Sequence, residues 1–147
     1  MCHVCELNAQ GDSLPLRERL YVDRHWRIAH GWSSLPGWLI VAARRHVESL
    51  HELEPEEAEP LGGLLRAASV ALQEIVGCEK TYVMLFAEHP RYPHVHFHVV
   101  PRMAWFGELE RSAAAFRFLN MPEDEQVPAP ERDRLAAEIG ASIVRHL

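Results

Sequence analysis

Residues 94–100, with the sequence HVHFHVV, place three histidines in alternation with apolar side chains. Because successive side chains of a β-strand point to opposite faces, a strand here would line His94, His96 and His98 along one face and bury the intervening residues on the other. Crowded imidazoles repel one another when protonated, so we expect lowered pKa values and neutral rings near pH 7. A neutral imidazole is both a nucleophile and a metal ligand, and the pattern favours these roles over a solvated polar face.

A second group of reactive side chains is the pair Cys2 and Cys5 at the start of the chain. A redox dithiol of the thioredoxin type would follow a strand and open a helix, and no strand precedes this pair. Two unrelated buried cysteines are a second interpretation. The favoured interpretation is half of a tetrahedral zinc site, completed by histidines. Cys78 stands alone after a helix and is typical of a small buried hydrophobe.

The elements that must position these residues are short strands and two helices. We predict mostly loop over 1–19 and 103–128, strands at 20–22, 26–30, 38–42, 81–86 and 94–100, and helices over 55–76 and 132–147. Pro55 suits the first position of the long helix, and Gly77 suits its end. The last two strands pair as an antiparallel hairpin. The order indicates an α+β domain with an antiparallel sheet.

Length and charge narrow the class of protein. A chain of 147 residues is the size of a single domain. Its net charge of −6 disfavours a long footprint on a nucleic-acid polymer. The sequence has neither a membrane-spanning apolar run nor a signal peptide, and its odd cysteine count argues against a disulfide framework. We therefore expect a cytoplasmic protein that binds a small anionic ligand and no membrane.

Taken together, these motifs resemble the histidine triad (HIT) superfamily of nucleotide hydrolases and transferases. The resemblance covers residues 1–102 and is carried by the triad strand and by residues 37–50, GWLIVAARRHVESL. Residues 103–147 form a C-terminal extension that ends in a helix. The family implies an antiparallel sheet with one long helix after the third strand and a C-terminal helix. It also implies a homodimer that pairs through the long helix and an edge strand.

The N-terminal cysteine pair is similar to the zinc-bearing branch of the superfamily. In that branch the metal is held by the two cysteines, by a histidine after the "L-I-V" strand and by the first histidine of the triad. The implied ligands here are Cys2, Cys5, His46 and His94. Four protein ligands leave no open position on Zn²⁺, so the metal is expected to be structural.

The resemblance assigns the chemistry to the other two histidines of the triad. His96 is expected to attack an α-phosphorus and form a nucleotidyl-histidine, which water or another acceptor then cleaves. His98 is expected to contact the phosphate and stabilise developing charge. The expected substrates are nucleoside phosphoramidates, dinucleoside polyphosphates or related nucleotides, and His98, where uridylyltransferases have glutamine, favours hydrolysis. The alternatives are a zinc-stabilised nucleotide-binding module without turnover and a redox or metal-buffer protein with an exposed cysteine pair.

The sequence departs from the family pattern just before the triad. Residues 87–93, AEHPRYP, lack the Asn, Gln and Ser groups that hold the phosphate in many relatives. Arg91 is a candidate replacement, with His89 in support; the alternative for Arg91 is a solvated loop charge. Trp38 is interpreted as core rather than as a base-stacking residue. Trp105 and Phe106 are expected in the core or a dimer contact rather than in a ligand pocket.

Overall fold

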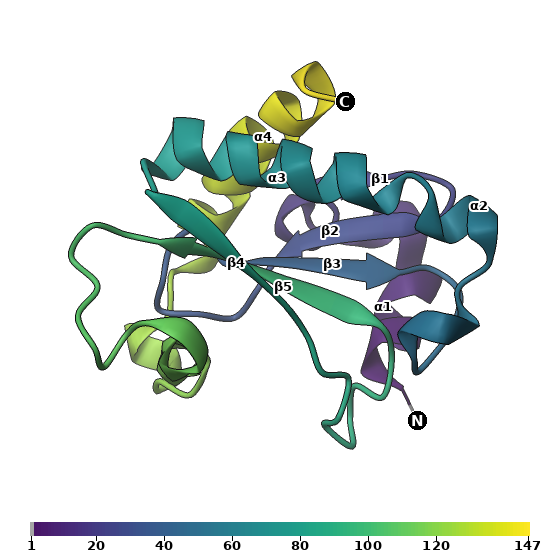
Figure 1. Ribbon diagram of the computed structural model, residues 1–147, viewed down its shortest axis with the longest axis horizontal. Helices are drawn as coiled ribbons and strands as arrows, with labels where there is room; N and C mark the ends of the chain where they lie inside the picture. Colours follow the sequence, from purple (N-terminus) through teal and green to yellow (C-terminus); the bar gives the residue numbers. More distant parts are fainter. Residues whose placement is uncertain (1) are drawn as a thin grey trace.

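The computed structural model describes residues 2–147, which fold around one five-stranded antiparallel sheet (Figure 1). The strands are β1 (Tyr21–Val22), β2 (Trp26–His30), β3 (Leu39–Ala43), β4 (Lys80–Leu85) and β5 (His96–Arg102). Their order across the sheet is β1-β2-β3-β5-β4, and every neighbouring pair is antiparallel. The strand that carries the histidines is therefore an inner strand, between β3 and β4. The predicted α+β class with an antiparallel sheet is confirmed.

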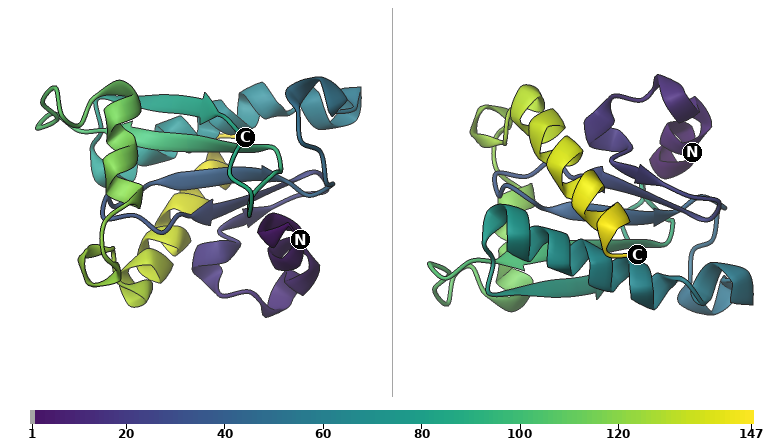
Figure 2. Two further views of the ribbon diagram at one scale, coloured as in Figure 1. Left: turned by 90° about the horizontal axis from the view of Figure 1, so that it is seen from below. Right: turned by 90° about the horizontal axis from the view of Figure 1, so that it is seen from above.

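Helices cover the two faces of the sheet unequally. The α-helices are α1 (His3–Gln10), α2 (Pro55–Ala58), α3 (Leu61–Val76) and α4 (Ala129–Arg145), and the 3-10 turns are η1 (Gly11–Ser13), η2 (Leu16–Glu18), η3 (Leu50–Glu52), η4 (Ser112–Leu119) and η5 (Glu123–Glu125). Figures 1 and 2 show α3 and α4 packed across one face, with α1 and η4 at opposite ends of the other. The face between α1 and η4 is thus less densely covered. None of the helices described is long and apolar enough to cross a bilayer.

The long helix expected over 55–76 is present but divided. It forms the short α2 and the 16-residue α3, which meet at Glu59 and Pro60. Proline lacks the N–H of a helical hydrogen bond and crowds the preceding turn, so it interrupts the ladder here. The apolar stripe of α3 packs on the sheet, and Gly77 ends the helix in the left-handed conformation with φ of 73°.

Alternation along the strands determines which side chains enter the main core. Phe97 and Val99 of β5 are buried against α3 and α4, together with Leu39 and Val41 of β3. Val95, just before β5, belongs to the same core. This outcome confirms that the apolar residues of the histidine segment face inward.

Other regions also differ from the prediction, including the last helix, which spans Ala129–Arg145 rather than 132–147. Residues 3–10 form α1 rather than loop, because hydrogen bonds with distant segments secure this short helix: the His3 N–H donates to the Arg91 carbonyl (3.0 Å), and the Asn8 amide donates to the Ala43 carbonyl (3.0 Å). Met1, part of the same predicted loop, lies outside the described residues.

The predicted loop over 103–128 contains η4 and η5, and its Phe106 packs with Trp38 in a second apolar cluster. Strand β5 begins at His96 rather than at residue 94.

Candidate functional site

A cavity of about 430 Å³ lies on the sheet face opposite α3, between α1 and η4. Its floor consists of alternate side chains from three adjacent strands. Those residues are Arg27 and Ala29 of β2, Ile40 and Ala42 of β3, and His96 and His98 of β5. The register pairs Ala42 with His96 and Ile40 with His98. Small and aliphatic neighbours therefore leave open space beside the two histidines.

The structure separates the three triad histidines into two groups. His96 and His98 lie side by side on the cavity floor, with ring centroids 5.1 Å apart. His94 precedes the strand, is fully buried, and has its ring beside Cys2 and Cys5. Alternation alone predicts a single row of three equivalent imidazoles. The structure instead sets His94 apart from the other two.

The hydrogen bonding of His96 determines which of its nitrogens is free. Nδ1 lies 2.6 Å from the backbone carbonyl oxygen of His94. A carbonyl only accepts, so Nδ1 carries the proton and Nε2 keeps its lone pair. Burial lowers the pKa of His96, so the ring is neutral near pH 7. A neutral ring with a free Nε2 is the form that can act as a nucleophile.

His98 is held in the opposite arrangement. The indole N–H of Trp38 donates to His98 Nδ1 at 3.1 Å, which leaves the ring proton of the neutral form on Nε2. Burial, with a smaller contribution from His96, lowers the pKa of His98 to about 3. Its Nε2–H is therefore a neutral hydrogen-bond donor in a ring that lines the cavity. Trp38 is fully buried, as the core interpretation expects, and its hydrogen bond to His98 was not anticipated.

A second cluster joins the start of α1 to the segment before β5. One ligand atom each from Cys2, Cys5, His46 and His94 lies within 4.8 Å of the other three. Sulfur-to-Nδ1 distances are 3.5 Å for Cys2–His94, 3.3 Å for Cys5–His46 and 3.5 Å for Cys5–His94, and the two Nδ1 atoms are 3.2 Å apart. Tetrahedral Zn²⁺ with ordinary bond lengths would separate S and N by about 3.5 Å and two N atoms by about 3.3 Å.

The outer partners of these histidines support the fit to a metal. His94 Nε2 lies 2.6 Å from the Ala43 carbonyl, and His46 Nε2 lies 3.3 Å from a Glu48 carboxylate oxygen. Both rings thus place their protons outward and turn unprotonated Nδ1 atoms toward each other, as zinc-bound histidines commonly do. Burial, with Cys2 adding to it, raises the pKa of Cys5 to about 11, so a bound cation would be needed to keep the Cys5 sulfur as a thiolate near pH 7. The donor set is consistent with zinc.

The segment before the triad contributes one of its two predicted residues to the cavity. His89 is part of the lining, and its Nδ1 accepts the Arg91 backbone N–H at 3.1 Å. The described lining does not include Arg91, whose guanidinium lies 6.0 Å from the centre of the Tyr92 ring. The structure therefore brings His89 together with His96 and His98 but leaves Arg91 exposed at the surface.

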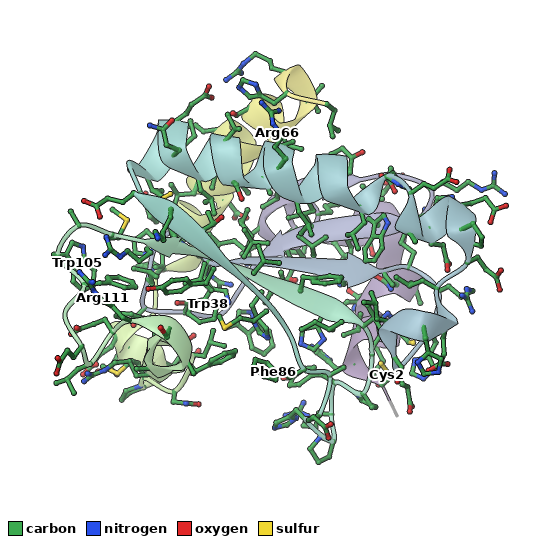
Figure 3. All side chains as sticks on the ribbon, viewed as in Figure 1. Cys2, Trp38, Arg66, Phe86, Trp105 and Arg111 are labelled. Carbon is green, nitrogen blue, oxygen red and sulfur yellow. The ribbon has the colours of Figure 1, made fainter. Side chains whose placement is uncertain are left out.

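Several cavity residues were missed from the sequence. They include Arg27 and Glu18, both buried, and the aromatic residues Trp32 and Tyr92. The available signal was Arg27 itself, a charged residue within the apolar strand 26–30. Of the two aromatic residues considered from the extension, Phe106 is core and Trp105 is exposed (Figure 3). Figure 3 also shows Cys2 and Trp38 on the sheet side away from α3.

Comparisons with known proteins identify solved structures that share this fold. No protein-family model matches the chain. A zinc-bound histidine triad family protein from Mycobacterium smegmatis is similar with a TM-score of 0.69 at 19% identity, over 98% of this chain and 94% of that one. A hypothetical histidine triad nucleotide-binding protein from Sulfolobus tokodaii gives a TM-score of 0.71 at 15% identity, over 98% and 93%. A uridylyltransferase gives 0.64 at 22% identity, over 99% of this chain and 46% of that one.

These similarities establish the fold. The described residues adopt the fold of histidine triad proteins, and the resemblance drawn from the triad and the cysteine pair is confirmed at that level. Two of these structural neighbours are described as a nucleotide-binding protein and as a uridylyltransferase.

Proposed function

We propose that this protein is a nucleotide hydrolase of the histidine triad superfamily, acting at an α-phosphorus through a covalent intermediate on His96. The observation that carries the proposal is the opposite protonation of two neighbouring rings in one cavity. His96 has its lone pair on Nε2, whereas His98 has its proton there. A nucleophile beside a hydrogen-bond donor is the arrangement that phosphoryl transfer requires.

In the first half of the proposed reaction, His96 Nε2 attacks the α-phosphorus. A P–N bond forms, the bond from phosphorus to the leaving group breaks, and the leaving group departs with the electron pair and takes up a proton from solvent. The His96 ring becomes positively charged, so its Nδ1–H bond to the His94 carbonyl becomes charge-assisted and stronger. His98 donates its Nε2–H to a phosphoryl oxygen and stabilises the charge that accumulates there.

In the second half, water attacks the same phosphorus. A P–O bond forms and the P–N bond breaks, and the water loses a proton to solvent. The nucleoside monophosphate leaves and His96 returns to its neutral form. Transfer to another acceptor in place of water would follow the same course. We propose nucleoside phosphoramidates and dinucleoside polyphosphates as the substrate classes.

The residues before the triad are proposed as phosphate contacts. With His89 Nδ1 accepting a backbone N–H, the proton of the neutral ring lies on Nε2 and is available to a phosphate oxygen. We propose that Arg91 also contacts the phosphate groups of the substrate, from outside the cavity lining. Its guanidinium is exposed and lies 6.0 Å from the ring centre of Tyr92, which lines the cavity.

We propose that Cys2, Cys5, His46 and His94 bind one structural Zn²⁺. When bound, the ion supplies folding free energy by cross-linking α1 to the segment before β5. His94 would then hold its own carbonyl oxygen in place, and that oxygen orients His96. His94 therefore serves both groups. Its side chain belongs to the proposed metal site, and its backbone carbonyl orients the proposed nucleophile, His96.

We also propose a homodimer and a cytoplasmic location. The dimer is supported by β4, an edge strand whose Val83 side chain is exposed. A second candidate function is a zinc-stabilised nucleotide-binding module without turnover. The observation that favours it is the loop 87–93, which has no Asn, Gln or Ser to hold the phosphate.

The test is a panel of nucleoside phosphoramidates and dinucleoside polyphosphates, with wild-type protein, His96→Ala, and His51→Ala as a control at an exposed histidine outside the cavity. We expect turnover by the wild type and His51→Ala, and a nucleotidyl-histidine adduct that can be trapped on both by quenching without acid. Nucleotide binding without turnover or adduct would favour the binding module. Hydrolysis by His96→Ala at the wild-type rate would exclude covalent catalysis at this residue.

A further inference from the structure

Glu18 is the last residue of η2. Among the described residues that line the cavity, it is the single acidic one. Its exposed fraction is only 9%. A carboxylate rarely lies so deep in a protein without partners that satisfy its lone pairs. Neither catalysis at His96 nor the metal cluster uses this group.

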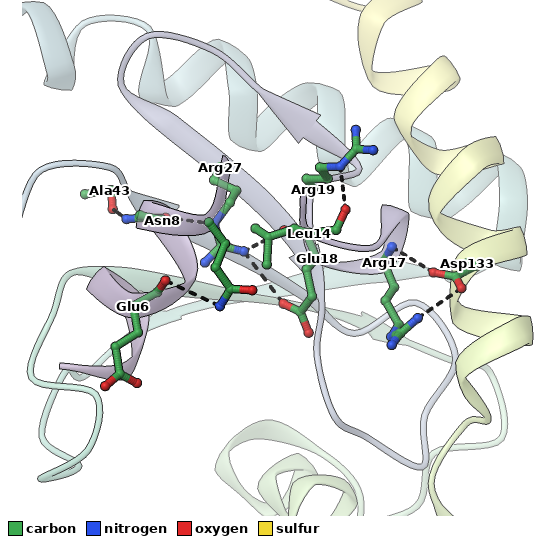
Figure 4. A network of polar contacts seen from close by, with 10 residues as sticks. Glu6, Asn8, Leu14, Arg17, Glu18, Arg19, Arg27, Ala43 and Asp133 are labelled. Atoms are coloured by element: carbon green, nitrogen blue, oxygen red, sulfur yellow. Dashed lines mark hydrogen bonds and ion pairs between the residues drawn. The ribbon is translucent and has the colours of Figure 1, made fainter. Parts of the chain in front are cut away.

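The Glu18 carboxylate makes no hydrogen bond with the residues described. Its nearest cation is Arg27, whose Nη1 lies 3.7 Å from Oε2, which is longer than a hydrogen bond. Two Arg27 nitrogens donate to other groups: Nε donates to Asn8 at 2.8 Å, and Nη1 donates to the backbone carbonyl of Glu18 at 2.6 Å (Figure 4). Arg27 therefore offsets the charge of the Glu18 carboxylate, whose oxygens accept no hydrogen bond from the described residues.

The sheet register sets the separation between His96 and Arg27, the cation beside this carboxylate. Arg27 on β2 pairs with Ala42 on β3, and Ala42 pairs with His96 on β5. Two strand spacings separate Arg27 from His96, which corresponds to about 10 Å across the sheet. The sugar and base of a nucleotide extend over a comparable length from the α-phosphorus.

We infer that Glu18 is a specificity-determining residue that accepts hydrogen bonds from donor groups of the nucleoside. This inference rests on the proposed function, with the α-phosphate at His96. The chemistry required is one or two donors that face a buried carboxylate, and a nucleoside offers them from its sugar hydroxyls or from the exocyclic amine of its base. A substrate donor would complete the unfilled positions of Glu18 without displacing Arg27 from Asn8.

The experiment compares three substrates: adenosine 5′-phosphoramidate, its 2′-deoxy form and inosine 5′-phosphoramidate. The deoxy form lacks a sugar donor and the inosine form lacks the exocyclic amine. We expect the wild type to favour the adenosine compound over one of the two analogues by about 10- to 100-fold in kcat/KM. This is the fold-change expected from the loss of one hydrogen bond to a charged group. In Glu18→Gln this ratio should fall toward one. Asp12→Asn, at an exposed carboxylate outside this cavity, should keep the wild-type ratio.

The ratio distinguishes recognition from a structural role. If Glu18→Gln lowers kcat/KM by the same factor for all three substrates, Glu18 supports the fold alone and the inference is overturned. If Glu18→Gln does not fold, equal kcat/KM for the three substrates on the wild type overturns it as well. If the wild type turns over none of them, the proposed hydrolysis fails. The same comparison is then made with the dissociation constants of AMP, 2′-deoxy-AMP and IMP, where an unchanged ratio in Glu18→Gln again overturns the inference.

Discussion

His94 in the Cys/His cluster and His96 in the proposed catalytic pair are two residues apart, and they leave opposite ring nitrogens available. His94 places its Nε2 proton on the Ala43 carbonyl and turns Nδ1 toward the cysteines. His96 places its Nδ1 proton on the His94 carbonyl and keeps Nε2 free. In each case a backbone carbonyl selects the nitrogen that remains available. The nitrogen that each of these two histidines leaves available therefore follows from the carbonyl that its ring meets.

Removal of the nucleophile is the strongest test of this comparison. We expect His96→Ala to lower kcat on the order of 10³-fold or more, as loss of a covalent nucleophile commonly does. Zinc content and melting temperature should barely change, because every residue of the metal cluster remains. Steady-state kinetics, metal analysis and thermal unfolding of the same preparation check the prediction. A loss of zinc in His96→Ala would show that the two groups are not separable.

The reciprocal change removes a proposed metal ligand. We expect His94→Ala to lose zinc and to lower the free energy of unfolding by several kcal/mol, with activity lost as a consequence. Chelation of the wild type should lower its melting temperature in the same direction. Thermal unfolding with and without chelator, together with the zinc content per chain, measures the effect. Zinc-free protein from a preparation made without chelator would contradict the metal assignment.

A third buried histidine, His30, extends the comparison to a ring with neither nitrogen free. Its Nδ1 lies 2.9 Å from the Gly31 carbonyl, and its Nε2 accepts the Gly37 N–H at 2.9 Å. Burial lowers its pKa from 6.5 to about 4. Above pH 6.5 the ring is neutral in both the folded and the unfolded chain. As the pH falls from 6.5 to 4, the unfolded chain binds a proton that the folded chain does not.

We therefore expect the free energy of unfolding to fall by about 3 kcal/mol on account of His30 as the pH drops from 6.5 to 4, and this contribution to level off below pH 4. Denaturant titrations across this range, with His30→Gln for comparison, measure it. The variant should be less stable at pH 7 and show a shallower decline with acid. Equal slopes for the two proteins would contradict the role assigned to His30.

The smallest expected effect concerns the hydrogen bond that orients His98. In Trp38→Phe the ring packing is largely kept, but the donor to His98 Nδ1 is lost. The His98 proton can then occupy either nitrogen, and we expect kcat/KM to fall about 5- to 10-fold, the weight of one hydrogen bond. Nitrogen NMR of His98 should show a mixture of its two neutral forms.

Trp26→Phe provides the matched control for this change. Trp26 is also fully buried, and its indole N–H donates to the Glu57 carbonyl on the core side of the sheet. Trp26→Phe should lower the free energy of unfolding by about as much as Trp38→Phe and leave kcat/KM unchanged. If both variants lose the same activity, the effect of Trp38 is on folding rather than on His98.

Local periodicity in the sequence was enough to predict the core-facing side chains of one strand and the position of one helix. Alternation over 94–100 predicts which side chains enter the core, since strand geometry sends neighbours to opposite faces. The spacing of apolar residues over 61–76 likewise predicts α3, although Pro60 divides the longer helix that was expected. The cysteine pair and the triad were sufficient to predict the fold family and to select the four residues that now lie together.

Contacts between segments that are distant in the chain set which nitrogen atoms remain available. The proton positions of His94, His96 and His98 depend on partners at Ala43, His94 and Trp38, and two of these three contacts join distant segments. The same holds for Glu18 and Arg27, whose burial arises because α1, η2 and β2 meet at one end of the cavity. Periodicity predicts which side chains share a face of one strand or helix. Hydrogen-bond partners and burial are set by segments that approach through space, so they follow only from the packed chain.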